Sequence, residues 1–146
     1  MRISALCLMI LLGMAVLVSG VSASGSEKTG NYTVVSAGNL HLPSVTSLAS
    51  SVITQGQVDV YSRVISSGTS SIITDLYWGN PANSLSLTIV APDETLGPYY
   101  DSADGIYNGR IALSVSSSAG LTPGTWKFYI TGYSVTGSQA YTFLTY

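Results

Sequence analysis

Hydrophobic and polar residues alternate with a period of two along several short stretches of this chain. These stretches lie at residues 32–34, 58–64, 72–78, 85–89, 111–115, 126–130 and 141–146. Successive side chains on a β-strand point to opposite faces of its sheet, so each stretch predicts a strand with one buried face. In the second stretch, Val58, Val60 and Val64 share one face and are predicted to form its apolar side.

Turn-forming residues separate the stretches. They are Ser66-Ser67-Gly68, Gly79-Asn80-Pro81, Ala91-Pro92-Asp93, Asp104-Gly105, Asn108-Gly109, Pro123-Gly124 and Thr136-Gly137. Gly and Asn accept positive φ angles and Pro presets φ for a turn. After residue 23, no window has apolar residues at helical spacing over three turns. About seven or eight short strands, each with one apolar face, predict an all-β protein built as an antiparallel β-sandwich.

The first 23 residues have the pattern of a secretory signal. Arg2 precedes an apolar run from Ile3 to Val18, and the small residues Val21-Ser22-Ala23 suit signal peptidase. The run is shorter than the roughly 20 residues that cross a membrane as a helix. We therefore expect an extracellular or cell-surface protein. The alternative is an uncleaved signal anchor, in which residues 3–18 would hold the chain in a membrane.

The remaining sequence divides into two parts. Residues 24–50 are predicted to be a flexible leader with a possible first strand, and residues 51–146 a single domain. Beyond residue 23, four basic residues (Lys28, Arg63, Arg110, Lys127) stand against seven acidic ones, a net charge of −3. This balance excludes the basic surface that nucleic acid requires. The only Cys is Cys7, so the domain can have no disulfide, Cys-ligated metal or thiol nucleophile.

The predicted surface is rich in hydroxyl groups, with 35 Ser and Thr in residues 24–146. One acceptor sequon, Asn31-Tyr32-Thr33, makes Asn31 a candidate glycosylation site in an exported protein. The alternative is a chance triplet.

Residues 51–146 carry a series of short motifs. They are Thr54-Gln55-Gly56-Gln57, Ser67-Gly68-Thr69, Asp75-Leu76-Tyr77-Trp78-Gly79, Leu85-Ser86-Leu87, Pro92-Asp93, Leu121-Thr122-Pro123-Gly124-Thr125-Trp126 and Tyr129-Ile130-Thr131-Gly132-Tyr133. Together, in this order, they resemble the bacterial and archaeal pre-peptidase C-terminal domain family. The resemblance implies a jelly-roll-like β-sandwich that accompanies secreted enzymes and has no catalysis of its own. One departure is Ser84-Leu85-Ser86-Leu87, where many members have Asp-Leu-Asp-Leu, so a calcium site built on those aspartates is not carried over.

The residues offer little for catalysis. The single histidine, His41, lies in an irregular stretch without a nucleophile-elbow motif nearby, and a surface or packing role is expected. Asp93 and Glu94 are adjacent in a Pro-led turn, where neighbouring side chains diverge and cannot act as paired carboxylates. We therefore expect no enzyme.

Calcium is the one cofactor that the sequence suggests. Asp101 and Asp104 lie three residues apart in a loop followed by Gly105, and Asn108 could add a side-chain oxygen. Calcium prefers six to eight oxygen ligands, which such a loop can supply in part, with Asp75 or Asp93 approaching from another strand. The spacing is not that of an EF-hand, and the alternative is a solvated turn.

The aromatic residues divide into two groups. Trp78, Trp126, Phe128 and Phe143 lie in strand patterns and are predicted to be core. Tyr99 and Tyr100 follow Gly97-Pro98 and, with Tyr107, flank the acidic loop. Flat aromatic faces can stack on sugar rings, so these three tyrosines are a candidate carbohydrate site. The alternative is that they pack over a sheet edge with their hydroxyls in solvent.

These observations predict a secreted or cell-surface, non-catalytic module that binds or supports extracellular proteins or polysaccharides. One alternative is a calcium-dependent carbohydrate-binding module. Another is a structural envelope or filament protein that self-associates through its strand edges. Only 8% of the residues are charged, so few charges are available to protect those edges.

Overall fold

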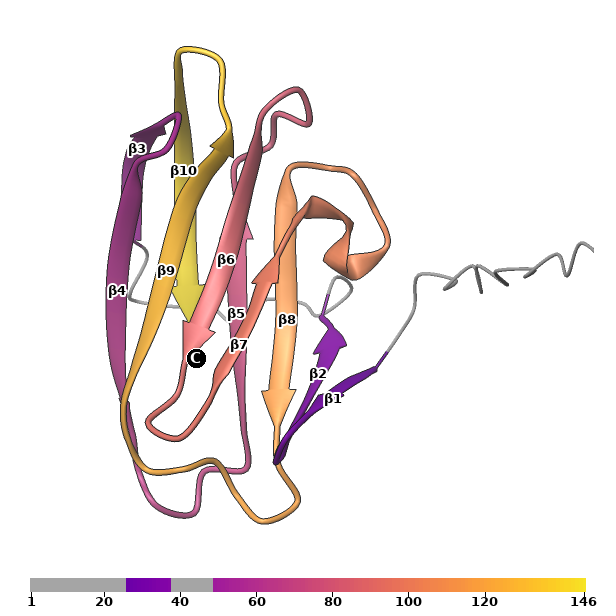
Figure 1. The fold of residues 1–146 in the computed structure, drawn as a ribbon, viewed down its shortest axis with the longest axis vertical. Coiled ribbons are helices and arrows are strands. Elements are labelled where there is room, and N and C mark those ends of the chain that lie inside the picture. Colours follow the sequence, from indigo (N-terminus) through magenta and orange to yellow (C-terminus); the bar gives the residue numbers. More distant parts are fainter. Residues whose placement is uncertain (1–25, 38–48) are drawn as a thin grey trace, which may run out of the picture.

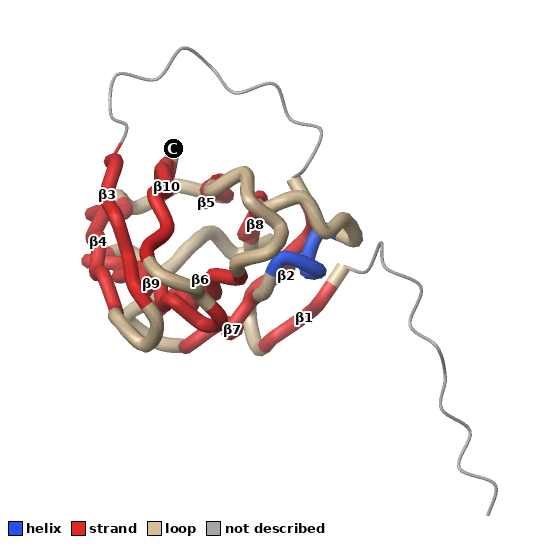
Figure 2. Tube along the Cα trace, turned by 90° about the horizontal axis from the view of Figure 1, so that it is seen from above, coloured by secondary structure: helices blue, strands red, loops and turns tan. Residues whose placement is uncertain are grey.

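A computed structural model describes residues 26–37 and 49–146, which form a sandwich of two antiparallel sheets (Figures 1 and 2). The predicted all-β sandwich is confirmed. The strands are β1 (Glu27–Thr29), β2 (Tyr32–Ser36), β3 (Ala49–Thr54), β4 (Val58–Ile65), β5 (Ser71–Tyr77), β6 (Ser84–Val90), β7 (Thr95–Tyr99), β8 (Arg110–Ser116), β9 (Gly124–Ser134) and β10 (Ser138–Thr145). The helical content of the described residues is one short 3-10 helix, η1 (Asp101–Asp104).

The strands divide unequally between the two sheets. One sheet has six strands in the order β1-β2-β8-β5-β10-β3, and the other has four in the order β4-β9-β6-β7. Ten strands exceed the expected seven or eight. The strands outside the predicted stretches are β1, β3 and β7. β2 matches the predicted stretch at residues 32–34, pairs with β8 and buries Tyr32 and Val34. The six-stranded sheet therefore includes residues from Glu27 onward, ahead of the predicted domain boundary at residue 51.

The core lies between the two sheets and is rich in aromatic residues. Trp78, Trp126, Phe128 and Phe143 are all buried, which confirms their predicted place. The rings of Phe128 and Phe143, from opposite sheets, are 5.4 Å apart, and Tyr32 meets Trp126 edge-on at the same distance. Aromatic pairs in this geometry add to the free energy gained by burial, so these contacts hold one sheet on the other.

The prediction for the face of β4 is wrong. Val58, Val60 and Val64 are 48%, 52% and 72% exposed, whereas Ile65 is buried on the opposite face of the strand. On that inner face, the Tyr61 ring packs 5.2 Å from the ring of Phe143. Ile65 joins the core and Tyr61 packs against it, so these two residues, and not the three valines, form the inward apolar face.

The inner face of β4 also carries Asp59, at the open side of the sandwich. Tyr141 of β10 donates its hydroxyl to Asp59 Oδ2 at 2.6 Å, and Ser51 of β3 donates at 3.2 Å. The Tyr61 and Tyr141 hydroxyl oxygens lie 2.9 Å apart. Burial, followed by the bond to Asp59, raises the pKa of Tyr141. These polar contacts connect the two sheets where apolar packing ends.

The predicted turn sequences lie between strands or at their ends. Glycines with positive φ occur at six of them: Gly68, Gly79, Gly105, Gly109, Gly124 and Gly137. At the seventh, Ala91 N donates to Glu94 O at 2.8 Å. The predicted signal segment and His41 lie outside the described residues. Among the residues that are described, no helix is long and apolar enough to cross a membrane.

Tyr32 fastens β2 to loops at the other sheet. Its ring is fully buried, and its hydroxyl donates to Asp93 Oδ1 at 2.6 Å. Thr122 donates to the other oxygen, Oδ2, at 2.7 Å. These bonds, that of Tyr32 first, hold the pKa of Asp93 below its usual value. The early strand β2 is thus tied to the β6–β7 and β8–β9 connections.

We expect Tyr32→Phe to lower the free energy of unfolding at neutral pH by about 1–2 kcal/mol, because the hydroxyl loses its bond to a carboxylate. Asp93 is exposed, which keeps the effect modest. A carboxyl group whose pKa is lower in the folded state stabilises the fold at pH values above its unfolded pKa. This contribution to the free energy of unfolding is lost as the pH falls through the folded pKa. The difference from wild type should therefore shrink below about pH 4. Urea unfolding at several pH values measures it, and a constant difference would contradict this role of Asp93.

Candidate functional site

The connection between β7 and β8 brings together most of the predicted site residues, and Asp101 organises it. The side chain is only 5% exposed. Asp101 Oδ1 accepts the backbone N–H groups of Asn108, Gly109 and Arg110 at 3.1–3.2 Å, and Oδ2 accepts Gly109 again at 3.1 Å. A carboxylate that receives several backbone donors fixes a loop firmly, because these bonds are charge-assisted. Asp101 is therefore the anchor of this loop.

Gly109 seats the loop on the neighbouring β5–β6 turn. Its φ is +75°, and a Cβ there would lie 2.8 Å from the backbone nitrogens of Gly79 and Asn80. The Gly109 carbonyl accepts Trp78 N at 2.8 Å. Only glycine allows this close approach of two backbones.

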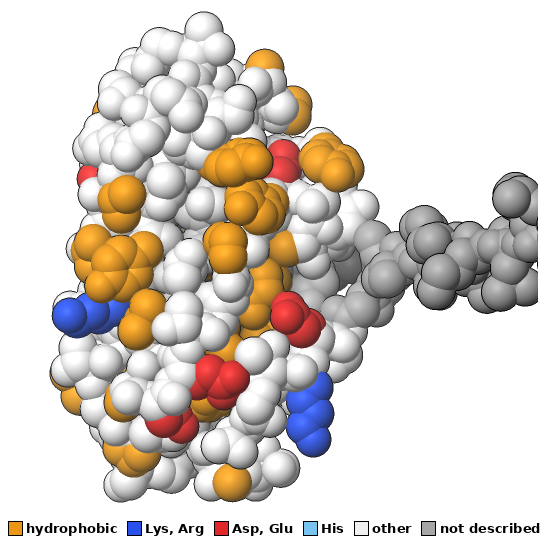
Figure 3. All heavy atoms as spheres, in the orientation of Figure 1, with side chains coloured by type: hydrophobic (Ala, Val, Ile, Leu, Met, Phe, Trp, Pro, Cys, Tyr) orange, Lys and Arg blue, Asp and Glu red, His pale blue; other side chains and the backbone are white. Residues whose placement is uncertain are grey.

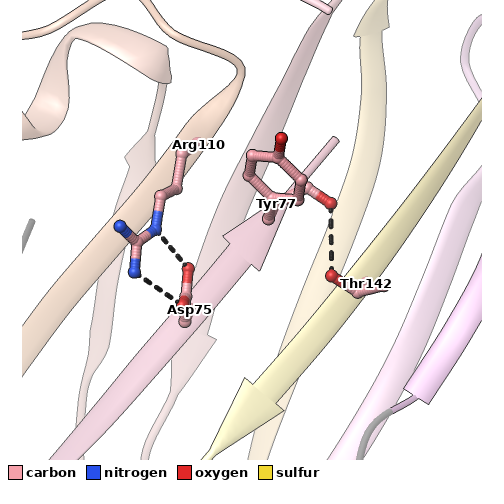
Figure 4. A network of polar contacts seen from close by, with 4 residues as sticks. All are labelled: Asp75, Tyr77, Arg110 and Thr142. Atoms are coloured by element: carbon pink, nitrogen blue, oxygen red, sulfur yellow. Dashed lines mark hydrogen bonds and ion pairs between the residues drawn. The ribbon is translucent and has the colours of Figure 1, made fainter. Parts of the chain in front are cut away.

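Arg110 ties the same loop to the six-stranded sheet. Its guanidinium donates to both oxygens of Asp75, from Nε and Nη2, each at 2.8 Å (Figure 4). Asp75 is 3% exposed, and two residues further along β5 the Tyr77 carbonyl accepts the Thr142 hydroxyl of β10 at 3.5 Å. A bidentate pair of this kind is geometrically specific. Asp75 is thus engaged with Arg110 on the outer face of the sheet.

The predicted calcium residues lie in one loop but in different environments. Asp104 Oδ1 accepts Ile106 N at 3.0 Å, while its buried Oδ2 has no hydrogen-bond partner among the described residues. Burial raises the pKa of Asp104, and the charge of Asp101 acts in the same direction. Asn108 is exposed. In the described part of the chain no group of three or more His, Cys, Asp or Glu side chains could hold a metal ion. The unbonded Asp104 Oδ2 is one of the six to eight oxygens that calcium prefers, and calcium stays a prediction.

The predicted tyrosine site needs one correction. Tyr99 is 7% exposed and belongs to the core, so its ring cannot stack on a ligand. Tyr100 and Tyr107 do lie together, and Tyr133 at the end of β9 joins them. The Tyr100 and Tyr133 rings are 4.7 Å apart at 60°, and Tyr107 is 75% exposed.

These three rings border a shallow pocket of about 450 Å³, which we call the tyrosine pocket. Its lining residues are Pro81, Ser84, Tyr100, Asp101, Ser102, Tyr107 and Tyr133. Figure 3 shows hydrophobic side chains around an acidic one in the region between the upper end of β9 and the β7–β8 connection. The volume lies within the range of small-ligand sites, and the lining combines flat rings with a few polar groups.

Tyr133 was missed from the sequence although a signal existed. Phe128 and Ile130 are core residues of β9, so Tyr129 and Thr131, which alternate with them, must face outward. Tyr133 is 55% exposed, following the buried Gly132. What the pattern could not supply is its proximity to Tyr100, because β9 and the β7–β8 connection are far apart in the sequence.

A second pocket, of about 420 Å³, lies on the outer face of the six-stranded sheet. It is lined by Ser50, Ser51, Val52, Tyr77, Trp78, Ala140, Tyr141 and Thr142. Its surface is mostly that of β3, β5 and β10, and Tyr77 is its one half-exposed aromatic ring. It offers fewer aromatic faces than the tyrosine pocket.

Asn31 is exposed in the turn between β1 and β2, so its side chain is accessible to modification. Glycosylation there stays a prediction.

No protein-family model matches this chain, and a search of curated proteins finds no match. What is established is an all-β domain of two packed sheets.

We expect Asp101→Ala to lower the free energy of unfolding by about 3 kcal/mol, because buried backbone donors lose a charged acceptor. Asp104→Ala serves as the matched control, since Asp104 accepts a single backbone N–H, and should cost clearly less. Urea unfolding of both variants measures the difference. Equal losses would show that Asp101 does not anchor the loop.

If Asp104 Oδ2 binds calcium, Ca²⁺ should raise the melting temperature and EDTA should lower it. Asp104→Asn keeps the acceptor for Ile106 N but removes the charge, and should abolish the difference between the two conditions. Identical melting of the wild type in Ca²⁺ and in EDTA would rule the site out.

Proposed function

We propose that this chain is an extracellular or cell-surface, non-catalytic module that binds glycans through the tyrosine pocket. The observation that carries the proposal is the convergence of Tyr100, Tyr107 and Tyr133 on one pocket. Two of these rings are more than half exposed, although burial would normally be favourable for them.

The chemistry of the pocket suits a sugar. Exposed aromatic faces bury the apolar face of a sugar ring, while hydroxyls such as those of Ser84 and Ser102 can bond its hydroxyls. The loop that carries Tyr107 is held by Asp101 and seated by Gly109. A ring already held in place loses less conformational entropy on binding, which favours recognition.

The engagement of the carboxylates supports a binding role over a catalytic one. Asp59, Asp75, Asp93 and Asp101 each accept hydrogen bonds from structural partners within the domain. A general acid or base has to face substrate, and these four groups are occupied in holding strands and loops.

We further propose that the domain is of the pre-peptidase C-terminal type and is exported. Two of the motifs that carry the resemblance hold loops of the sandwich in place, which supports the family assignment. Gln55 joins the β3–β4 corner to β9 by accepting Val135 N at 2.7 Å and donating to Tyr133 O at 3.0 Å. Trp126 donates its indole N–H to Thr122 O at 2.9 Å. The partner would then be a polysaccharide or an extracellular protein at the cell surface.

Residues 24–146 should be retained on an insoluble polysaccharide such as cellulose or chitin. Tyr107→Ala and Tyr133→Ala should each weaken retention by about fivefold or more, because one stacked ring contributes about 1 kcal/mol. Depletion of the protein from solution over a range of polysaccharide concentrations measures the affinity, with Ca²⁺ or EDTA in parallel.

Tyr77→Ala is the matched control. Tyr77 is as exposed as Tyr133, at 52% against 55%, but lies on the other sheet. It should leave retention unchanged. Loss of retention in the Tyr77→Ala variant alone would indicate that the glycan binds at the second pocket. Retention on isolated cell envelopes, but on neither polysaccharide, would indicate that the ligand is a protein and not a glycan.

A further inference from the structure

The strand β4 is the longest edge strand in the described part of the chain. It has eight residues and forms one edge of the four-stranded sheet, where only β9 pairs with it among the described strands. The other edges are shorter, and two carry features that discourage pairing. β7 contains Pro98, and β1 has three residues, of which two are charged. An unprotected edge presents free N–H and C=O groups to another strand.

The hydrogen bonds to β9 decide which groups of β4 are free. Gly132 N donates to Gln57 O at 3.0 Å, and these two residues continue the register in which Val58 faces Thr131. Hydrogen-bonded pairs alternate along an antiparallel ladder, so the odd-numbered residues of β4 bond to β9. The even-numbered residues, Val58, Val60, Ser62 and Val64, therefore direct their backbone groups to the open side.

A second β4 strand can pair here only if even-numbered residues meet even-numbered residues. A two-fold axis at Tyr61 satisfies this condition over seven residues, from Val58 to Val64. It places Val58 opposite Val64 of the second copy and Val60 opposite Ser62. It also places Asp59 opposite Arg63 of the second copy, twice by symmetry.

We propose that β4 pairs antiparallel with β4 of a second copy of this chain, with the two-fold axis at Tyr61. Asp59 and Arg63 are the only charged residues of the strand, and their opposite charges lie at equal distances from the axis. Moving the axis to Ser62 would set Asp59 opposite Ile65, and moving it to Val60 would set Asp59 opposite Tyr61. The charges therefore select one register.

The exposed valines favour the same pairing. Val58, Val60 and Val64 line the outer face of β4, and Figure 3 shows hydrophobic side chains on that side of the molecule. In the proposed register each Val58 gains a valine neighbour across the interface. Both copies use the same edge, so association closes at two molecules, and two four-stranded sheets become one continuous sheet. This assembly is independent of glycan binding, because the tyrosine pocket is built by other residues.

Sedimentation velocity of residues 24–146, which contain every described strand, should show a concentration-dependent monomer–dimer equilibrium. Val60→Pro removes an N–H that β9 does not use and should give a monomer throughout the same concentration range. Arg63→Glu creates two like-charge pairs and should weaken the dimer at least about tenfold. Lys28→Glu, the same charge change on β1 at the far edge, should leave it unchanged. Far-UV circular dichroism confirms that each variant is folded.

Cysteine cross-linking tests the register, because the chain has no Cys after Cys7. Opposed residues in a hydrogen-bonded pair have Cα atoms about 5.5 Å apart, which a disulfide can span. Val60→Cys mixed with Ser62→Cys should cross-link under mild oxidation, and neither variant should do so alone.

A wild-type monomer at all concentrations would overturn the proposal, and so would a dimer that Val60→Pro and Arg63→Glu leave intact. Cross-linking of either single variant alone, with no mixed product of Val60→Cys and Ser62→Cys in the mixture, would overturn the register.

Discussion

The packing of the two sheets through their inner faces is the constraint on which the rest of this structure depends. Residues 24–146 contain no cysteine, so no disulfide can replace that packing. Each strand must therefore present its bulkiest apolar residues inward, as β9 does with Trp126, Phe128 and Ile130, all fully buried. Side chains alternate with a period of two, and a slip of one residue would turn a whole strand inside out. The outer faces are then free to carry other chemistry.

The constraint weakens at the open side of the sandwich, between β3 and β4, and polar contacts take over there. Asp59 accepts hydrogen bonds from hydroxyl groups on β10 and β3, and the neighbouring Tyr61 ring packs on the core. The cost of this arrangement is that the valines of β4 remain in solvent. The residues that hold the edge in place and those that make it suitable for a partner thus alternate along one strand.

Most of the aspartates in the described residues hold loops and strands in place. Asp101 accepts hydrogen bonds from three backbone N–H groups of the β7–β8 connection. Arg110 joins the end of that loop to Asp75 on the neighbouring strand. A buried carboxylate with several donors stabilises a loop that has little apolar surface of its own. The flat rings of the tyrosine pocket are consequently presented by a rigid frame.

Much of the fold was determined by the sequence alone. Period-two alternation located most of the strands and identified Trp78, Trp126, Phe128 and Phe143 as core residues. Glycine-containing turns were placed correctly because positive φ is a local requirement that few other residues meet.

Where the local sequence was compatible with two arrangements, only the tertiary structure decided between them. Both faces of β4 contain apolar residues, and contact with Phe143 selected the face of Tyr61. Tyr99 and Tyr100 are adjacent tyrosines, and only packing assigned one to the core and the other to the pocket. The sequence pattern predicted Asp101 as a metal ligand. In the fold its carboxylate accepts backbone N–H groups from residues seven to nine positions later in the chain. Alternation and turns are local properties of a sequence, whereas burial and hydrogen-bond partners depend on segments that only the folded chain brings together.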